Sequence, residues 1–117
     1  MKECLIMTIQ LPDSVRNYFQ ASNTYESDIL LDCFVEDAIF DDIGTIYTGR
    51  VAIKNHLVQE NNDLNTHTSI LKGVKVKDDY LVTAKVSGDF AGSPINFNFL
   101  FTTKNEKISK IKISLVD

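Results

Sequence analysis

Two adjacent carboxylates, Asp41 and Asp42, close a short apolar run with strand character at 38–40. Successive side chains of a β-strand point to opposite faces, so only one of the two can enter a given cavity. A large apolar residue such as Phe40 belongs inside, and by the two-residue period Asp42 follows it there. A carboxylate in an apolar pocket can act as a general base, because desolvation and neighbouring groups adjust its proton affinity. The alternative interpretation is a strand end that accepts backbone hydrogen bonds or is solvated.

A tyrosine is the second candidate for chemistry. Val15, Tyr18, Phe19 and Ser22 recur at helical spacing and predict one inward stripe with a phenol in its middle. A lone tyrosine in such a stripe is more often a core aromatic whose hydroxyl is hydrogen-bonded. The weight of Tyr18 as a site residue therefore comes from its pairing with Asp42.

Histidines and motifs offer few other candidates. His56 falls on the apolar side of a predicted helix, either as an imidazole at the edge of that face or as part of a site, and His67 is expected on a strand surface. The two histidines lack metal-ligand spacing such as HxxxH or HxH, and no Gly-rich phosphate loop, GxSxG turn or Cys-His arrangement is present. We therefore expect no metal and no cofactor, which leaves cofactor-free acid–base chemistry.

The elements that must position these residues follow from hydrophobic periodicity. Helices are predicted at 12–22, at 27–34 and from Thr48 to about Asn61. The second half changes to strand periodicity, with turns at 78–79, 91–94 and 104–106. Hairpin spacing of this kind indicates antiparallel pairing, and helices followed by strands indicate an α+β fold.

The order of residues around the acidic pair resembles the nuclear-transport-factor-2-like superfamily, which includes the ketosteroid isomerases and the SnoaL-like polyketide cyclases. Its members often carry a phrase like Asp-Ala-Ile-Phe-Asp-Asp, here at 37–42, followed by Gly-Arg-x-Ala-Ile, here at 49–53. The resemblance spans nearly the whole chain. It implies a cone-shaped α+β domain in which three N-terminal helices pack on a curved antiparallel sheet.

The resemblance also implies roles for single residues. In ketosteroid isomerases an aspartate at the end of this strand shuttles a proton between carbons, while a tyrosine and a protonated aspartic acid stabilise the enolate oxygen. These positions correspond to Asp42, Tyr18 and Asn98. Asn98 departs from the pattern, because an amide is a weaker donor than a protonated acid, and weakened isomerase activity is expected. The pocket is expected to include Ser22, Phe34, Phe40 and His56.

The register of the strand that carries Asn98 has a second consequence. If Asn98 faces the cavity, then Phe97, Phe99 and Phe101 occupy the opposite face of the sheet. Such an apolar outer face is expected to be buried in a homodimer. If instead these phenylalanines line the cavity, Asn98 points away.

Three functions are consistent with this sequence. The first is cofactor-independent proton transfer on a small, largely apolar carbonyl compound, as in an isomerase or a cyclase, with Asp42 as base. The second is a non-catalytic domain for small-ligand binding or dimerisation, because one fold hosts many functions. The third is a lyase or dehydratase that uses His56 with Asp42. Ile43, where the isomerases have a proline, and a loop shortened before Gly49 put a steroid substrate in doubt.

Composition sets the outer bounds. The chain has 117 residues, 44% of them hydrophobic and 24% charged, which suits a single domain over 1–117. A net charge of −4 without a basic block argues against nucleic acid as a partner. Cys4 and Cys33 are too few for a disulfide framework and are expected to be free, buried thiols. The apolar run at 4–7 is too short for a signal peptide, and no stretch is long enough to span a membrane, so we expect a cytoplasmic protein.

Overall fold

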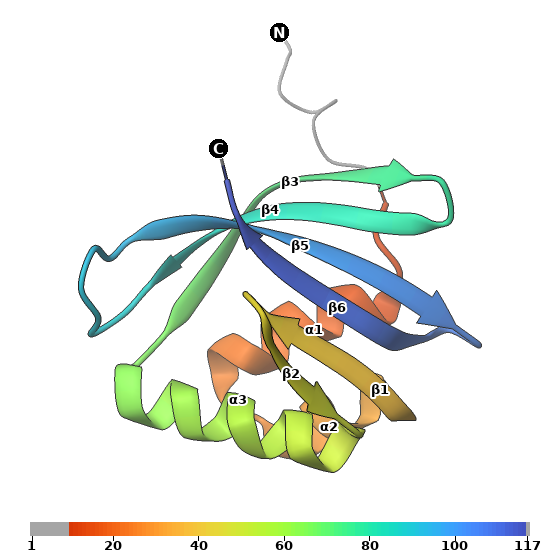
Figure 1. Ribbon diagram of the computed structural model, residues 1–117, viewed down its shortest axis with the longest axis horizontal. Helices are drawn as coiled ribbons and strands as arrows, with labels where there is room; N and C mark the ends of the chain where they lie inside the picture. The colour runs from red at the N-terminus through yellow and green to blue at the C-terminus, as the bar shows by residue number, and fades with distance from the viewer. Residues whose placement is uncertain (1–9, 117) are drawn as a thin grey trace, which may run out of the picture.

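The computed structural model describes residues 10–116 and shows an α+β fold, as expected. Helices on one side of a curved, open sheet cover its concave face (Figure 1). The helices are α1 (Asp13–Thr24), α2 (Ser27–Asp32) and α3 (Arg50–Leu64). The strands are β1 (Phe34–Asp42), β2 (Thr45–Thr48), β3 (His67–Val76), β4 (Asp79–Ser87), β5 (Ile95–Lys104) and β6 (Lys107–Leu115), in the order β2-β1-β6-β5-β4-β3. None of the helices within 10–116 has the length and apolarity needed to cross a membrane.

Two details of the predicted architecture are wrong. The hairpin of β1 and β2 separates α3 from the first two helices, so the three helices do not all precede the strands. The sheet is also mixed, because β1 pairs in parallel with β6, with Phe40 opposite Ile111. The second strand of this hairpin, β2, was missed because the loop before it has only two residues, Ile43 and Gly44, both with positive φ (49° and 96°). A two-residue loop of this kind matches the right-handed twist of the flanking strands, and glycine supplies the second position without strain.

The core lies between the concave face of the sheet and the helices. Its largest fully buried side chains are Phe34, Phe40, Phe101, Leu30, Ile53, Ile108, Ile111, Val15 and Val82. Aromatic rings of α1 meet those of β5 edge to face, with the Tyr18 and Phe101 centroids 5.6 Å apart and those of Phe19 and Phe99 5.3 Å apart. The predicted inward stripe of α1 is therefore present, and α1 packs directly over β5. Cys33 is buried as expected, whereas Cys4 and the run at 4–7 lie outside the described residues.

The register of β5 corrects the position expected for Asn98. Phe99 lies opposite Val82 of β4, and both side chains face the helices with Phe101. Asn98 therefore faces the outer side of the sheet, where the Thr83 hydroxyl donates a hydrogen bond of 2.7 Å to its Oδ1. The physical reason is the two-residue period: three phenylalanines gain more from burial than one amide, and they take the inner face.

The same register removes the argument for a dimer through the outer face. A dimer of that kind requires Phe97, Phe99 and Phe101 on the outer face of the sheet. All three lie on the inner face, packed in or against the core. A homodimer stays a prediction that these residues no longer support.

Candidate active site

A cavity opens between α1, α3 and the concave face of the sheet, with a volume of about 260 Å³. This is slightly below the roughly 300–1,000 Å³ of pockets that hold drug-sized ligands, so it suits a small molecule. Aliphatic and aromatic side chains make up most of the wall; the aromatic ones are Tyr18, Phe40, Phe90, Phe97 and Phe99. The residues with polar side-chain atoms are Tyr18, Ser22, Asp42, Glu60, Asn61, Thr66 and Thr68, and the two carboxylates among them are Asp42 and Glu60.

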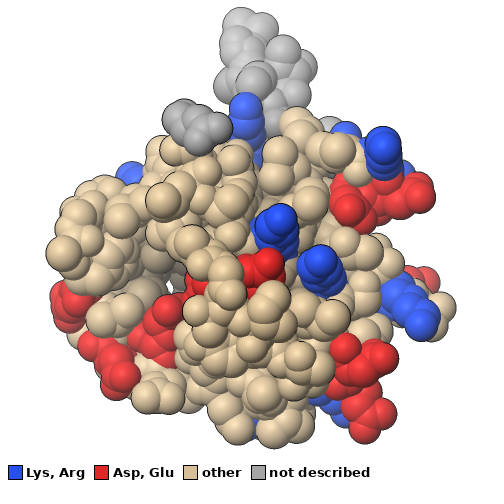
Figure 2. All heavy atoms as spheres, in the orientation of Figure 1, with Lys and Arg blue, Asp and Glu red and all other residues tan. Residues whose placement is uncertain are grey.

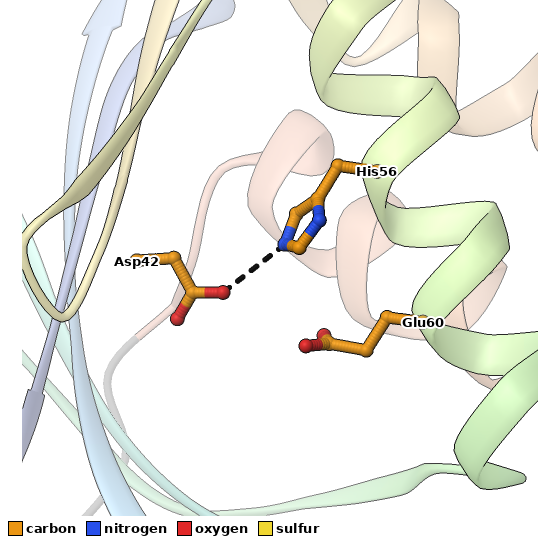
Figure 3. A group of neighbouring side chains, drawn as sticks. All are labelled: Asp42, His56 and Glu60. Carbon is orange, nitrogen blue, oxygen red and sulfur yellow. Dashed lines mark hydrogen bonds and ion pairs between the residues drawn. The ribbon is translucent and has the colours of Figure 1, made fainter.

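Asp42 reaches this cavity from the last position of β1. Its Oδ2 lies 3.1 Å from Nε2 of His56 on α3, and both side chains are largely buried (Figure 3). Asp41 turns the other way, and its Oδ1 accepts a hydrogen bond of 2.8 Å from the backbone N–H of Gly44 in the hairpin loop. The predicted orientation of the pair, with Asp42 at the cavity and Asp41 away from it, agrees with the structure.

His56 is held in place by an aromatic neighbour that sequence reasoning missed. The rings of His56 and Tyr47 stack with centroids 4.0 Å apart and planes at 14°. Tyr47 comes from β2, and without that strand nothing in the sequence places Tyr47 near α3. The stack fixes the plane of the imidazole, so that Nε2 faces Asp42. His56 does not itself line the cavity, so it contacts the carboxylate and not the ligand space.

Glu60 is the second residue that the sequence analysis missed. It follows His56 by four positions on α3, so the two side chains share one face of the helix. Figure 3 shows Glu60 beside the Asp42–His56 pair. Burial raises the pKa of the Glu60 carboxyl, the nearby Asp42 carboxylate raises it further, and His56 acts in the opposite direction. Glu60 therefore keeps its proton to higher pH than an ordinary glutamate. The four-residue spacing from His56 was the available signal.

Tyr18 lines the cavity from α1, as predicted, and only 4% of it is exposed. Burial raises the pKa of its phenol far above the usual value, and the Glu60 and Asp42 carboxylates raise it further. The phenol is therefore protonated at neutral pH, and it can donate a hydrogen bond to a ligand oxygen.

The remaining predicted pocket residues divide into two groups. Ser22 and Phe40 line the cavity, whereas Phe34 and His56 do not. Phe34 is fully buried beneath Tyr18, with ring centroids 6.0 Å apart, and belongs to the core that supports the cavity wall. The structure therefore brings Tyr18 and Asp42 together and leaves Asn98 on the opposite face of the sheet.

One group of side chains in the described part of the chain could hold a metal ion. Asp42, His56 and Glu60 each offer one ligand atom, and these atoms lie within 4.8 Å of one another. Imidazole nitrogen and carboxylate oxygen are common ligands of zinc and other divalent metals. The sequence did not reveal this group because its members come from two elements. The expectation that the protein works without a metal stays a prediction.

Comparison with known proteins identifies the fold family. No family model matches the sequence, and no curated protein matches it significantly. Among solved structures, the chain is similar to a candidate polyketide cyclase from Sinorhizobium meliloti, with 36% identity over 89% of this chain and 95% of that chain and a TM-score of 0.85. The chain belongs to the nuclear-transport-factor-2-like superfamily. The family predicted from 37–42 and 49–53 is thereby confirmed.

More distant members of the superfamily share the fold alone. A protein from Catenulispora acidiphila with a ketosteroid isomerase-like fold, solved in complex with trimethylamine, is 23% identical over 90% of this chain and 86% of that chain, with a TM-score of 0.78. An LEH-like epoxide hydrolase from M. tuberculosis is 11% identical over 88% of this chain and 80% of that chain, with a TM-score of 0.75. These similar structures carry different descriptions. The fold alone therefore does not determine the activity, which depends on the side chains of the cavity.

Proposed function

We propose that this protein catalyses cofactor-independent proton transfer on a small, largely apolar carbonyl compound, with Asp42 as the general base. One observation carries the proposal. The Asp42 carboxylate lines a mostly apolar cavity while His56 holds it through a hydrogen bond of 3.1 Å. A base that is oriented in this way inside a mostly apolar cavity fits proton abstraction from carbon.

The reaction uses two groups of the cavity wall. Asp42 takes a proton from the carbon next to the carbonyl, and the electrons of that C–H bond move into an enolate. The Tyr18 phenol donates a hydrogen bond to the enolate oxygen, where negative charge develops. Where the substrate has a β,γ double bond, the enolate is a dienolate; Asp42 then returns the proton to the γ-carbon, the double bond moves to the α,β position and the carbonyl re-forms, which is an isomerisation. In a cyclase the enolate carbon instead attacks a second carbonyl of the same molecule, and the new alkoxide takes up the proton.

His56 acts as a positioning residue in this account. It contacts Asp42 and does not line the ligand space, while its stack on Tyr47 fixes the direction of Nε2. A base held in one orientation needs less rearrangement to reach the transition state.

Asp42 and His56 are also consistent with a second function, that of a lyase or dehydratase. In a lyase or dehydratase, Asp42 would remove a proton from carbon while His56 protonated the departing hydroxyl. The short Asp42–His56 contact favours this alternative, and the position of His56 behind the carboxylate disfavours it, because a leaving group in the cavity meets Asp42 first.

Hydrogen exchange tests the proposal without knowledge of the natural substrate. A panel of small ketones in D₂O is followed by NMR for loss of the hydrogens next to the carbonyl. We expect exchange faster than in buffer alone for at least one ketone, and the same rate for Asp41→Asn, whose carboxamide keeps the Oδ1 acceptor for Gly44.

Two other results would redirect the assignment. A ketone that binds in the cavity and exchanges no faster than in buffer would favour a ligand-binding domain. Loss of water from a β-hydroxy ketone, without exchange in the simple ketones, would favour the lyase.

A further inference from the structure

The cavity is acidic as well as apolar. Asp42 and Glu60 line it, and no lysine or arginine is among the described residues of its wall. Figure 2 shows acidic side chains bordering a hollow on the left of one face, with the basic side chains set apart from it. Within the described part of the chain, the basic side chain beside the two carboxylates is His56, which already bonds to Asp42. The carboxylate of Glu60 has no hydrogen-bonded partner among residues 10–116.

Aromatic rings make up the other part of this wall. They belong to Tyr18, Phe40, Phe90, Phe97 and Phe99, and they come from α1, β1, β5 and the loop before β5. The face of an aromatic ring carries partial negative charge and attracts a cation, and the attraction is stronger where water is excluded. Rings and carboxylates in one cavity therefore favour the same sign of charge in a ligand.

Burial of the Asp42 and Glu60 carboxylates costs free energy as long as no ligand occupies the cavity. A carboxylate removed from water is disfavoured unless a partner compensates it, and two carboxylates side by side repel each other. The raised pKa of Glu60 has these two causes, burial first and Asp42 second. A positively charged ligand group beside Glu60 would supply the compensation that the protein's own side chains lack.

We propose that the ligand of this cavity carries an alkylammonium group, which Glu60 and the aromatic rings bind while Asp42 faces the reacting carbon. The substrate class is then a small amino ketone rather than a neutral ketone. This inference rests on the proposed function and narrows it. Glu60 serves to recognise charge, and the Asp42–His56 pair serves to move the proton.

The affinity of the cavity for a cation should depend on pH. Asp42 of β1, His56 of α3 and Tyr18 of α1 are the titratable groups that face Glu60. A bound cation favours the ionised form of Glu60, so binding releases a proton wherever Glu60 is protonated in the free protein. Affinity for a cation should therefore rise as the pH increases from about 4.3, the ordinary value for glutamate, through the raised pKa.

A matched pair of probes tests the charge directly. Choline and 3,3-dimethylbutan-1-ol have nearly the same shape and differ in a positive nitrogen against a neutral carbon. NMR titration of the whole protein at pH 7 measures both dissociation constants. We expect choline to bind at least about tenfold more tightly, which corresponds to roughly 1.4 kcal/mol.

Substitutions of Glu60 and Asp42 show which of the two carboxylates causes the preference for choline. The preference is the dissociation constant of the alcohol divided by that of choline. In Glu60→Gln this ratio should fall towards one, and in Asp42→Asn it should fall less. Asp63→Asn is the control, because Asp63 is an exposed acid on the same helix and outside the cavity wall. Circular dichroism checks that each variant is folded. If Glu60→Gln does not fold, the wild-type preference and its rise with pH still decide the matter.

Several results would overturn the inference. Equal binding of the two probes, tighter binding of the alcohol, or no binding of either would show that the wall does not select a cation. Displacement of choline by Zn²⁺ or Mn²⁺ at micromolar concentration would make the cluster of Asp42, His56 and Glu60 a metal site instead. The proposed function fails separately: a choline preference without exchange on either amino ketones or neutral ketones contradicts proton transfer, and exchange on neutral ketones without a choline preference contradicts this inference alone.

Discussion

Asp42 at the end of β1 and His56 on α3 are joined by a hydrogen bond of 3.1 Å, which ties the edge hairpin of the sheet to the longest helix. The contact depends on β2, because Tyr47 of that strand stacks on the imidazole. The hairpin therefore does two things: it delivers the carboxylate to the cavity, and it fixes the group that orients the carboxylate.

The phenol of Tyr18 should matter for catalysis and little for stability. Tyr18→Phe keeps the ring that packs on Phe101 and Phe34 and removes the donor to the enolate oxygen. Loss of one such donor typically lowers turnover by about 10²–10³-fold. The rate of ketone exchange should fall by that order, and urea unfolding should change by about 1 kcal/mol or less. Full activity in this variant would remove Tyr18 from the mechanism.

The register of β5 predicts very different costs for two nearby substitutions. Phe101→Ala empties a fully buried site and should lower the free energy of unfolding by about 3–5 kcal/mol. Asn98→Ala loses one hydrogen bond with Thr83 on the outer face and should cost about 1 kcal/mol. Urea unfolding of both variants measures the difference. A costly Asn98→Ala together with a mild Phe101→Ala would mean that the strand faces the other way.

Glu60 should make stability depend on pH in a defined direction. Its pKa is raised in the folded protein, so the folded state holds the proton more tightly than the unfolded state. The stability that this proton contributes is complete below about 4.3 and is lost as the pH rises through the raised value. Glu60→Gln has no such titration, so its stability relative to the parent should increase between pH 4 and pH 7. Unfolding at the two pH values checks this, with Asp63→Asn as the control. An unchanged difference would contradict the raised pKa.

Much of the fold could be predicted because it follows from periodicity. The inward stripe of α1 and the orientation of Asp42 relative to Phe40 both depend on neighbours along the chain, and both agree with the structure. The superfamily was identified from local phrases at 37–42 and 49–53. The parallel pairing of β1 with β6 could not be predicted in this way, since the pairing depends on residues about 70 positions apart, as in Phe40 and Ile111.

The errors at the site also have a physical origin. Asn98 was placed inside by correspondence with a family position, although the flanking Phe97 and Phe99 favoured the opposite register by their size. Glu60 was overlooked because a single glutamate on a helix is usually solvated, and only the closure of the sheet over α3 shows that it lies in the cavity. Tyr47 could not be placed without the β2 strand. The sequence alone does not show which residues of different helices and strands lie close together.

The central claim is that Asp42 is the base, and the most direct test compares two adjacent aspartates. Asp42→Asn and Asp41→Asn make the same chemical change, one at the cavity and one at the hairpin loop. The rate of ketone exchange in D₂O, measured by NMR on both folded variants, should fall by about 10²–10⁴-fold in Asp42→Asn, the usual contribution of a general base, and stay near the parent rate in Asp41→Asn. Exchange that survives Asp42→Asn, or that is lost equally in both variants, would contradict the account.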